Sequence, residues 1–177
     1  MANYPQKLKP LVRLIKKLRK ARDPAHDFAH VKRVMRLASV IADKSFDKEK
    51  LLLLCLLHGL THEEEKNEKG ILEQMYGKDA ASDIIKSAKR LTKNPETYEE
   101  KVVHDANLLD SLGAIGMARA FMKGGYEKQS IKKTIEIIKR NTKRKFLTKR
   151  GRTLGRRRKE FTSKFLKRLE KELLSDF

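Results

Sequence analysis

The sequence predicts an all-α fold, a single-domain helical bundle over residues 1–177. Apolar residues recur three and four positions apart in nearly every segment, which is the spacing of a helix face. No segment keeps the strict alternation of a half-buried strand, and only four prolines interrupt the chain. A chain of 177 residues is long enough to bury a core without disulfides or metals as staples. The single cysteine, Cys55, therefore fits a small core residue in a reducing compartment.

The first half of the chain divides into three expected helices. The apolar stripe of a basic helix within residues 1–22 consists of Leu8, Leu11, Val12, Ile15 and Leu18. Asp23 and Pro24 have the character of an N-cap and a first turn, and they predict a second helix that continues to Ile41. Asp47 is expected to cap a third helix, which residues 51–57 make apolar all round and therefore central. Gly59 then suits the left-handed position that follows a helix.

The second half continues the helical pattern to the C-terminus. We expect helical segments at residues 71–76 and 82–91, a loop at 94–96, one or two helices over 99–123, and a helix around Ile135. The last helix has one apolar face, which is expected to lie on the core. This face consists of Phe161, Phe165, Leu169 and Leu173.

The net charge of +20 is concentrated at the two ends of the chain. Residues 7–22 carry eight Lys or Arg and no acid, and residues 143–171 carry fourteen against two acids. The 143–177 segment belongs to the same domain, and its densest basic run is Arg156, Arg157, Arg158 and Lys159. We expect the two basic segments to lie side by side, since chain ends of a compact domain are often close. Such a patch indicates nucleic-acid binding without sequence preference, or steering of small phosphorylated substrates, or only a solvated face.

Two classes of location are disfavoured by the sequence. The longest strictly apolar stretch, residues 51–57, is much shorter than the roughly 20 residues that span a bilayer. The N-terminus lacks the apolar core of a secretion signal. We therefore expect a cytoplasmic protein that does not contact a membrane.

The chain has five histidines, which are His26, His30, His58, His62 and His104. His26 and His30 lie one helical turn apart, whereas His58 ends the apolar helix. A lone histidine in a helical protein is more often a surface or core residue than a metal ligand. Spacing alone therefore gives only weak support to a metal site.

Three motifs taken in order give a stronger indication. The stretches HDFAHVKRV, LLHG and VHDANLLDSLGAIGMARAF together resemble the small HD-domain proteins, a superfamily of metal-dependent phosphohydrolases. The pattern of that family is H…HD…D, spread over an all-helical bundle. The resemblance covers roughly residues 23 to 174.

The resemblance implies that His30, His58 and Asp105 bind a divalent metal such as Mn, Fe, Co, Ni or Zn, because imidazoles and carboxylates suit these ions. The aspartate that should follow the second histidine is replaced by Gly59, and Asn107 stands where the small-family motif more often has Asp. Removal of a carboxylate removes one ligand and one negative charge. We therefore expect weak metal binding, with His62, His26 or water as substitute ligand.

The resemblance also places His26, Asp27 and Arg33 at the pocket, where His26 and Arg33 would hold a phosphate and Asp27 would orient a ligand. The alternative for Asp27 and Arg33 is that they are charges on the helix surface. Asp110 is expected to orient Arg119 or a helix end. The expected function is that of a metal-dependent phosphohydrolase acting on a nucleotide or other phosphate ester, impaired by the missing aspartate. The alternative is a weak or inactive HD-fold protein that binds nucleic acid through its basic ends.

Overall fold

The computed structural model describes residues 4–43 and 45–174, except for the side chains of His62, Glu63 and Glu65. All regular secondary structure in this part of the chain is helical, which confirms the predicted all-α class. Two 3₁₀ turns, η1 (Gln6–Leu8) and η2 (Pro24–His26), precede the first two helices. The helices are α1 (Lys9–Lys20), α2 (Phe28–Ile41), α3 (Lys48–Leu57), α4 (His62–Tyr76), α5 (Lys78–Arg90), α6 (Tyr98–Asp110), α7 (Gly113–Tyr126), α8 (Ile131–Lys143) and α9 (Lys149–Leu173).

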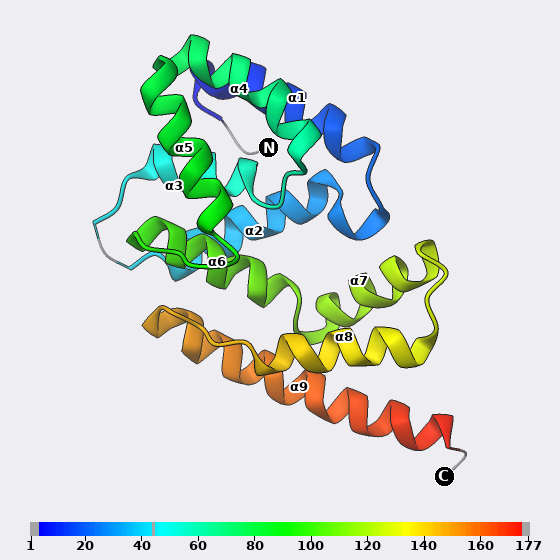
Figure 1. Cartoon of the computed structure of the whole chain (residues 1–177). Coiled ribbons are helices and arrows are strands. Elements are labelled where there is room, and N and C mark those ends of the chain that lie inside the picture. Colours follow the sequence, from blue (N-terminus) through cyan, green and yellow to red (C-terminus); the bar gives the residue numbers. More distant parts are fainter. Residues whose placement is uncertain (1–3, 44, 175–177) are drawn as a thin grey trace.

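Helices α2, α3 and α6 form the centre of the bundle (Figure 1). Their apolar faces meet in one cluster that includes the fully buried side chains of Val34, Leu54 and Leu109. The run 51–57 is buried along most of its length, as the sequence predicted for a central helix. Helices α1, α4 and α5 cover one end of this centre, and α7, α8 and α9 cover the other.

Helix ends are fixed by side-chain caps, some of which differ from the expected ones. Asp47 caps α3 by accepting hydrogen bonds from the amides of Glu49 and Lys50, as predicted. Asp23 caps the short turn η2, so α2 begins four residues later than expected, with Asp27 as its N-cap. The backbone of Gly59 is left-handed, with φ of +66°, as predicted for the residue that follows the C-cap.

The prediction that the two basic segments form one patch was wrong. Helix α1 packs on α2, α3 and α4, whereas α9 packs on α6, α7 and α8. Figure 1 shows α1 and α9 at opposite sides of the molecule, with α2 and α6 between them. Each basic helix covers a different side of the centre, so their charges face different regions of solvent.

The face that α9 buries also differs from the predicted one. Phe161 and Leu173 are 47% and 51% exposed. The buried positions of α9 are instead Gly151, Gly155, Thr162 and Leu166. Glycine is required at position 155, because a Cβ there would clash with the ring of Phe146. Of the predicted stripe, Leu169 packs on the cluster that contains Leu166, and Phe165 contacts the ring of Phe121, so the prediction was right for part of this face.

None of the described helices combines the length and the apolar character that crossing a lipid bilayer requires.

Candidate metal and phosphate site

The side chains of His30 and His58 meet at the centre of the bundle. His30 lies in the first turn of α2, and His58 directly follows α3 as its C-cap. Their Nε2 atoms are 2.9 Å apart. Both side chains are almost completely buried, so this contact is shielded from bulk water. The two histidines that the sequence pairs from separate motifs are thus brought together.

The other ring nitrogen of each histidine is committed to an acceptor. His30 Nδ1 lies 2.7 Å from the Asp110 carboxylate, and His58 Nδ1 lies 2.6 Å from the backbone oxygen of Cys55. A carbonyl and an ionised carboxylate can only accept, so both Nδ1 atoms carry the hydrogen and donate. Burial lowers the pKa of His30 to about 4, although Asp110 opposes the shift. Burial, with the charges of His30 and Arg19, lowers the pKa of His58 well below its usual value. Both rings are therefore neutral near pH 7.

Two neutral rings in these tautomers direct two unprotonated Nε2 atoms at each other. Without a proton between them, two lone pairs at 2.9 Å repel, whereas a cation bound by both relieves the repulsion. Ligand nitrogens about 2.1 Å from one ion and at right angles to each other are about 3.0 Å apart. The fixed tautomers, each set by a hydrogen bond on the far nitrogen, are also typical of metal-binding histidines. The pair therefore fits two neighbouring ligands of a divalent ion.

Carboxylates do not complete this pair. Among the side chains that the structure describes, no group of three or more His, Cys, Asp or Glu is placed to hold a metal. Gly59 and Asn107 line the same pocket as the histidines, and neither has a carboxylate. The described residues therefore fit an ion whose other ligands come mostly from a bound molecule or from water.

Asp105 does not join the histidines, contrary to the sequence prediction. Its carboxylate is fully buried and accepts hydrogen bonds from the amides of Leu147 and Thr148 and from the Thr148 hydroxyl. It also contacts the ring of His104. These donors lie just before α9, so Asp105 holds the start of that helix against α6. The residue of α6 that faces the histidine pocket is Asn107.

Asp110 is the buried carboxylate that orients His30. It also accepts from Arg33 Nε at 2.9 Å and pairs with Arg119 at 3.0 Å. Burial alone would raise the pKa of Asp110, but the hydrogen bonds from His30 and Arg33 and the charge of Arg119 outweigh burial and lower it. Arg119 donates in addition to the carbonyl of Ala25 in η2. The predicted orientation of Arg119 by Asp110 is present, and the sequence did not reveal that Asp110 also positions His30.

Of the three residues predicted to flank the site, one lines the pocket and two are engaged in contacts of helix α2. Asp27 is engaged as the N-cap of α2, where it accepts from the amide of His30 at 2.8 Å, and Arg33 is paired with Asp110. His26 lines the pocket, with Nδ1 2.8 Å from the Asp23 carboxylate. His62 begins α4, but its side chain lies outside those that the structure describes, so its proposed role as substitute ligand has no structural account.

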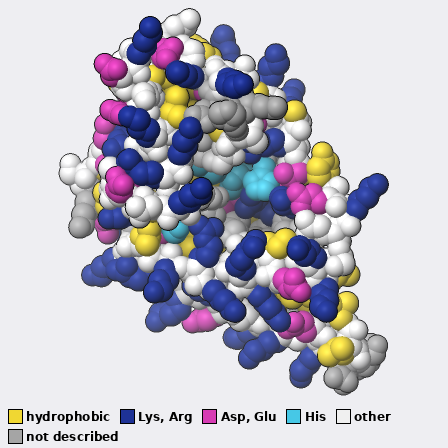
Figure 2. All heavy atoms as spheres, in the orientation of Figure 1, with side chains coloured by type: hydrophobic (Ala, Val, Ile, Leu, Met, Phe, Trp, Pro, Cys, Tyr) yellow, Lys and Arg dark blue, Asp and Glu magenta, His cyan; other side chains and the backbone are white. Residues whose placement is uncertain are grey.

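The pocket beside the histidine pair has a volume of about 240 Å³ and a basic lining. Figure 2 shows a patch of histidine surface in a hollow of this face, with Lys and Arg side chains around it. Arg19 Nη2 donates to the carbonyl of His58 at 2.6 Å, and Arg22 Nη1 donates to that of Gly59 at 2.7 Å. Lys123 of α7 also lines the pocket. These three cations were not predicted at the site, although Arg19 follows Ile15 by four residues and so falls on the buried face of α1.

The basic run of α9 divides into two pairs. Arg156 and Arg157 are exposed. Arg158 and Lys159 are partly buried, and they donate to the carbonyls of Leu109 and Arg144. Only the first pair is therefore directed to solvent as the sequence suggested for the whole run.

Comparisons with known proteins agree with this architecture. No family model matches the chain. The chain is 29% identical over 175 residues to the uncharacterized protein YpgQ of Bacillus subtilis, with 84% of each chain covered. The crystal structure of YpgQ in complex with ADP is similar, with 26% identity, a TM-score of 0.68, and 94% of this chain and 96% of that chain covered.

Two further solved structures cover nearly the whole chain. The Lin1889 protein from Listeria innocua is 27% identical, with a TM-score of 0.70 and coverage of 96% of this chain and 98% of that one. A predicted HD superfamily hydrolase from an uncultured Thermotogales bacterium is 25% identical, with a TM-score of 0.63 and coverage of 94% and 92%.

Proposed function

Because the chain has the HD-domain fold, we propose that it is a metal-assisted phosphohydrolase that acts on a nucleotide or a related phosphate ester. The observation that carries this proposal is the pair of unprotonated Nε2 atoms of His30 and His58, 2.9 Å apart and oriented by Asp110 and the Cys55 carbonyl. The ADP complex of YpgQ supports a nucleotide as the class of ligand.

His30 and His58 would hold the ion, and Asn107 offers a neutral amide oxygen in the same pocket. Phosphate oxygens of the ligand and water would supply the other ligands, since Gly59 has no carboxylate. When bound, such an ion polarises a phosphoryl oxygen and lowers the pKa of a bound water. Ion and phosphate ligand should therefore bind cooperatively, each with low affinity alone.

The basic lining of the pocket has a matching role. Arg22 and Lys123 line the pocket, where Arg22 is paired with Glu64 and Lys123 with Glu127, and Arg19 holds the His58 carbonyl in position. Charges of this sign attract a phosphorylated ligand and stabilise the negative charge that develops on its oxygens. His26, held by Asp23, lines the same pocket and would hydrogen-bond a phosphate.

The experiment is titration calorimetry of Mn²⁺ with and without ADP, together with measurement of phosphate release. We expect Mn²⁺ to bind at least about tenfold more tightly when ADP is present, and phosphate release to require Mn²⁺. His58→Gln should abolish both effects, whereas His104→Gln, a matched change at a buried histidine that faces Asp105 instead, should keep them. Equal phosphate release in a chelator, or an unaffected His58→Gln protein, would contradict the proposal.

A second candidate function is nucleic-acid binding, which one observation favours. The α9 side of the molecule presents exposed basic side chains, among them Arg156 and Arg157. Such a surface attracts polyanions through the release of their counterions, without sequence preference. This function would be independent of the histidine pair.

A further inference from the structure

Two phenylalanines of α9, which the sequence predicted on the core, are exposed. Phe161 is 47% exposed and Phe165 is 36% exposed. They lie four residues apart, so both project from the same side of the helix, about 6 Å apart along its axis. Large apolar side chains that gather on a surface mark a contact site. The neighbours of the two rings indicate what they contact.

Exposed cations lie directly beside the first ring. Arg157 lies one turn before Phe161 and Lys164 one turn after it, and both are exposed. Since each residue of a helix advances by about 100°, the two cations lie on the same side of Phe161, and Phe165 lies on the other side. The aromatic surface formed by Phe161 and Phe165 therefore has a basic edge along α9.

Acids near this aromatic surface are few. Glu160 is the only acid between residues 145 and 169, and Glu172 is paired with Arg168. On its other side, Phe165 contacts the ring of Phe121 in α7, with the centroids 6.3 Å apart. The exposed positions of α7 carry no charge, and they are Ala114, Ile115, Ala118, Met122, Gly125 and Tyr126. The two rings thus lie between the basic edge of α9 and an uncharged face of α7.

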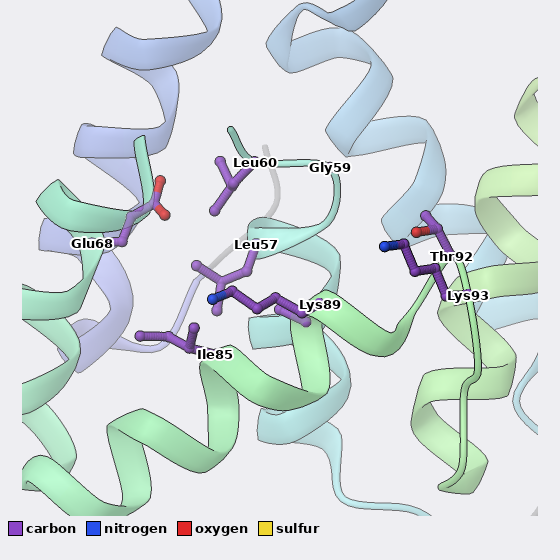
Figure 3. Close-up of a pocket in the computed structure, with 9 residues that line it drawn as sticks. Leu57, Gly59, Leu60, Glu68, Ile85, Lys89, Thr92 and Lys93 are labelled. Atoms are coloured by element: carbon purple, nitrogen blue, oxygen red, sulfur yellow. The ribbon is translucent and has the colours of Figure 1, made fainter. Parts of the chain in front are cut away.

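Another place where apolar surface meets lysines has a different composition. A pocket of about 290 Å³ lies between α3, α4 and α5, with Leu57, Leu60 and Ile85 in its walls (Figure 3). The described residues of its lining include Lys89 and Lys93 but no aromatic ring. Exposed rings beside exposed cations are therefore a feature of α9 and not of every apolar surface in the molecule.

We infer that the aromatic surface of α9 binds single-stranded nucleic acid, with bases stacked on Phe161 and Phe165 and phosphates at Arg157 and Lys164. This inference rests on the nucleic-acid function proposed above as the second candidate, and it does not involve the histidine pair. The faces of the bases are accessible in a single strand, whereas in a duplex they are stacked on each other. Stacking on aromatic side chains tolerates any sequence, because every base has a flat π face.

The charges favour a nucleic acid over a second copy of the chain on this surface. A second copy would bring further cations toward Arg157 and Lys164, and with a net charge of +20 on each chain repulsion would oppose association. A polyanion instead gains affinity from the same cations, because its counterions are released.

The test is fluorescence anisotropy of the full chain at about 50 mM salt with two labelled probes, oligodeoxythymidine and a mixed-sequence duplex of the same length. Phe161→Leu keeps an apolar side chain but removes the ring. It should weaken binding of oligodeoxythymidine about tenfold, as expected for loss of one base–aromatic stack, and leave duplex binding within about twofold of the parent. Phe161→Tyr, which keeps the ring, should bind both probes as the parent does. Leu173→Ala, at another exposed apolar position of α9, is the matched control and should also bind as the parent.

The results separate this surface from the nucleic-acid function as a whole. Unchanged oligodeoxythymidine binding by Phe161→Leu, or equal weakening with both probes, would overturn the stacking inference and leave the electrostatic function intact. If the parent binds neither probe, both are removed.

Phe161→Ser extends the test to two other partners of an apolar surface, a second copy and a lipid bilayer. The parent is examined alone by sedimentation velocity and with phosphatidylglycerol vesicles by co-sedimentation. If the parent forms a dimer or sediments with the vesicles, and Phe161→Ser does neither while it still binds oligodeoxythymidine as the parent does, the inference is wrong.

Discussion

Replacement of Gly59 by aspartate should strengthen metal binding at a modest cost in stability. The left-handed conformation, with φ of +66°, costs a side-chain-bearing residue roughly 1–2 kcal/mol, and aspartate is among the residues that tolerate it best. No atom lies within 4 Å of the added Cβ, so no steric term follows. A carboxylate and a divalent ion 4 Å apart attract by about 8 kcal/mol at an effective dielectric constant near 20, twice the value for two unit charges. With about two thirds of that lost to desolvation, about 2.7 kcal/mol remains, which is about 100-fold in affinity.

The assay is calorimetry of Mn²⁺ with the parent protein, Gly59→Asp and Gly59→Asn. Asparagine has the shape and backbone preference of aspartate but no charge, so it isolates the electrostatic contribution. Both variants should lose about 1 kcal/mol of unfolding free energy in urea. Only Gly59→Asp should gain about two orders of magnitude in Mn²⁺ affinity.

Two results would refute the reasoning. The parent could bind Mn²⁺ tightly without any phosphate ligand, in which case the missing carboxylate does not limit affinity. Alternatively, Gly59→Asp and Gly59→Asn could bind equally, in which case charge at position 59 is not directed at the ion.

Three further predictions concern other parts of the molecule. The first concerns pH, measured in a chelator. His30 has a pKa of about 4 in the folded protein and an ordinary value of 6.5. As the pH falls, the unfolded chain therefore binds a proton at His30 before the folded protein does. Stability should thus be full above pH 6.5 and fall by on the order of 3 kcal/mol toward pH 4, and His30→Asn should show a smaller fall in urea titrations. Asp105→Asn should lower the unfolding free energy by about 3 kcal/mol, because it leaves buried donors before α9 unpaired, and should not change Mn²⁺ binding. The control Asp83→Asn, at an exposed position, should change the unfolding free energy by less than about 0.5 kcal/mol. Fluorescence anisotropy with unrelated oligonucleotides should show binding at about 50 mM salt, and the affinity should fall by orders of magnitude at about 200 mM. The double variant Arg156→Glu/Arg157→Glu should bind more weakly than the parent. No binding at the lower salt would exclude the nucleic-acid function.

The sequence predicted the helical class, the buried helix at 51–57 and the left-handed Gly59, because each depends on local spacing or backbone preference. It could not decide which aspartate or asparagine of α6 faces the histidines. Residues 105 and 107 are about 200° apart around a helix, and α6 is buried on most sides, so both faces look alike in sequence. The resemblance therefore assigned the ligand to Asp105, although that carboxylate is used by the start of α9.

The placement of the basic ends failed for a different reason. Amphipathic spacing shows that α1 and α9 each lie on a core, but not that they lie on opposite sides of it. Arg19 was likewise counted with the solvent-facing charges, and its burial depends on the carbonyl of His58, which is 39 residues away in sequence. A contact between residues so far apart in the chain leaves no local pattern in the sequence.

The shared use of Asp110 affects how the site can change during evolution. This carboxylate orients His30, but it also neutralises Arg33 and Arg119, and Arg119 in turn ties α7 to η2. Loss of Asp110 would leave the buried Arg119 guanidinium without its ion-pair partner, so a stable fold needs this carboxylate whether or not the protein binds a metal. The orientation of His30 is therefore inherited together with the fold. A chain with glycine at position 59 and asparagine at position 107 still keeps an oriented histidine, beside which a carboxylate at either position would add a ligand.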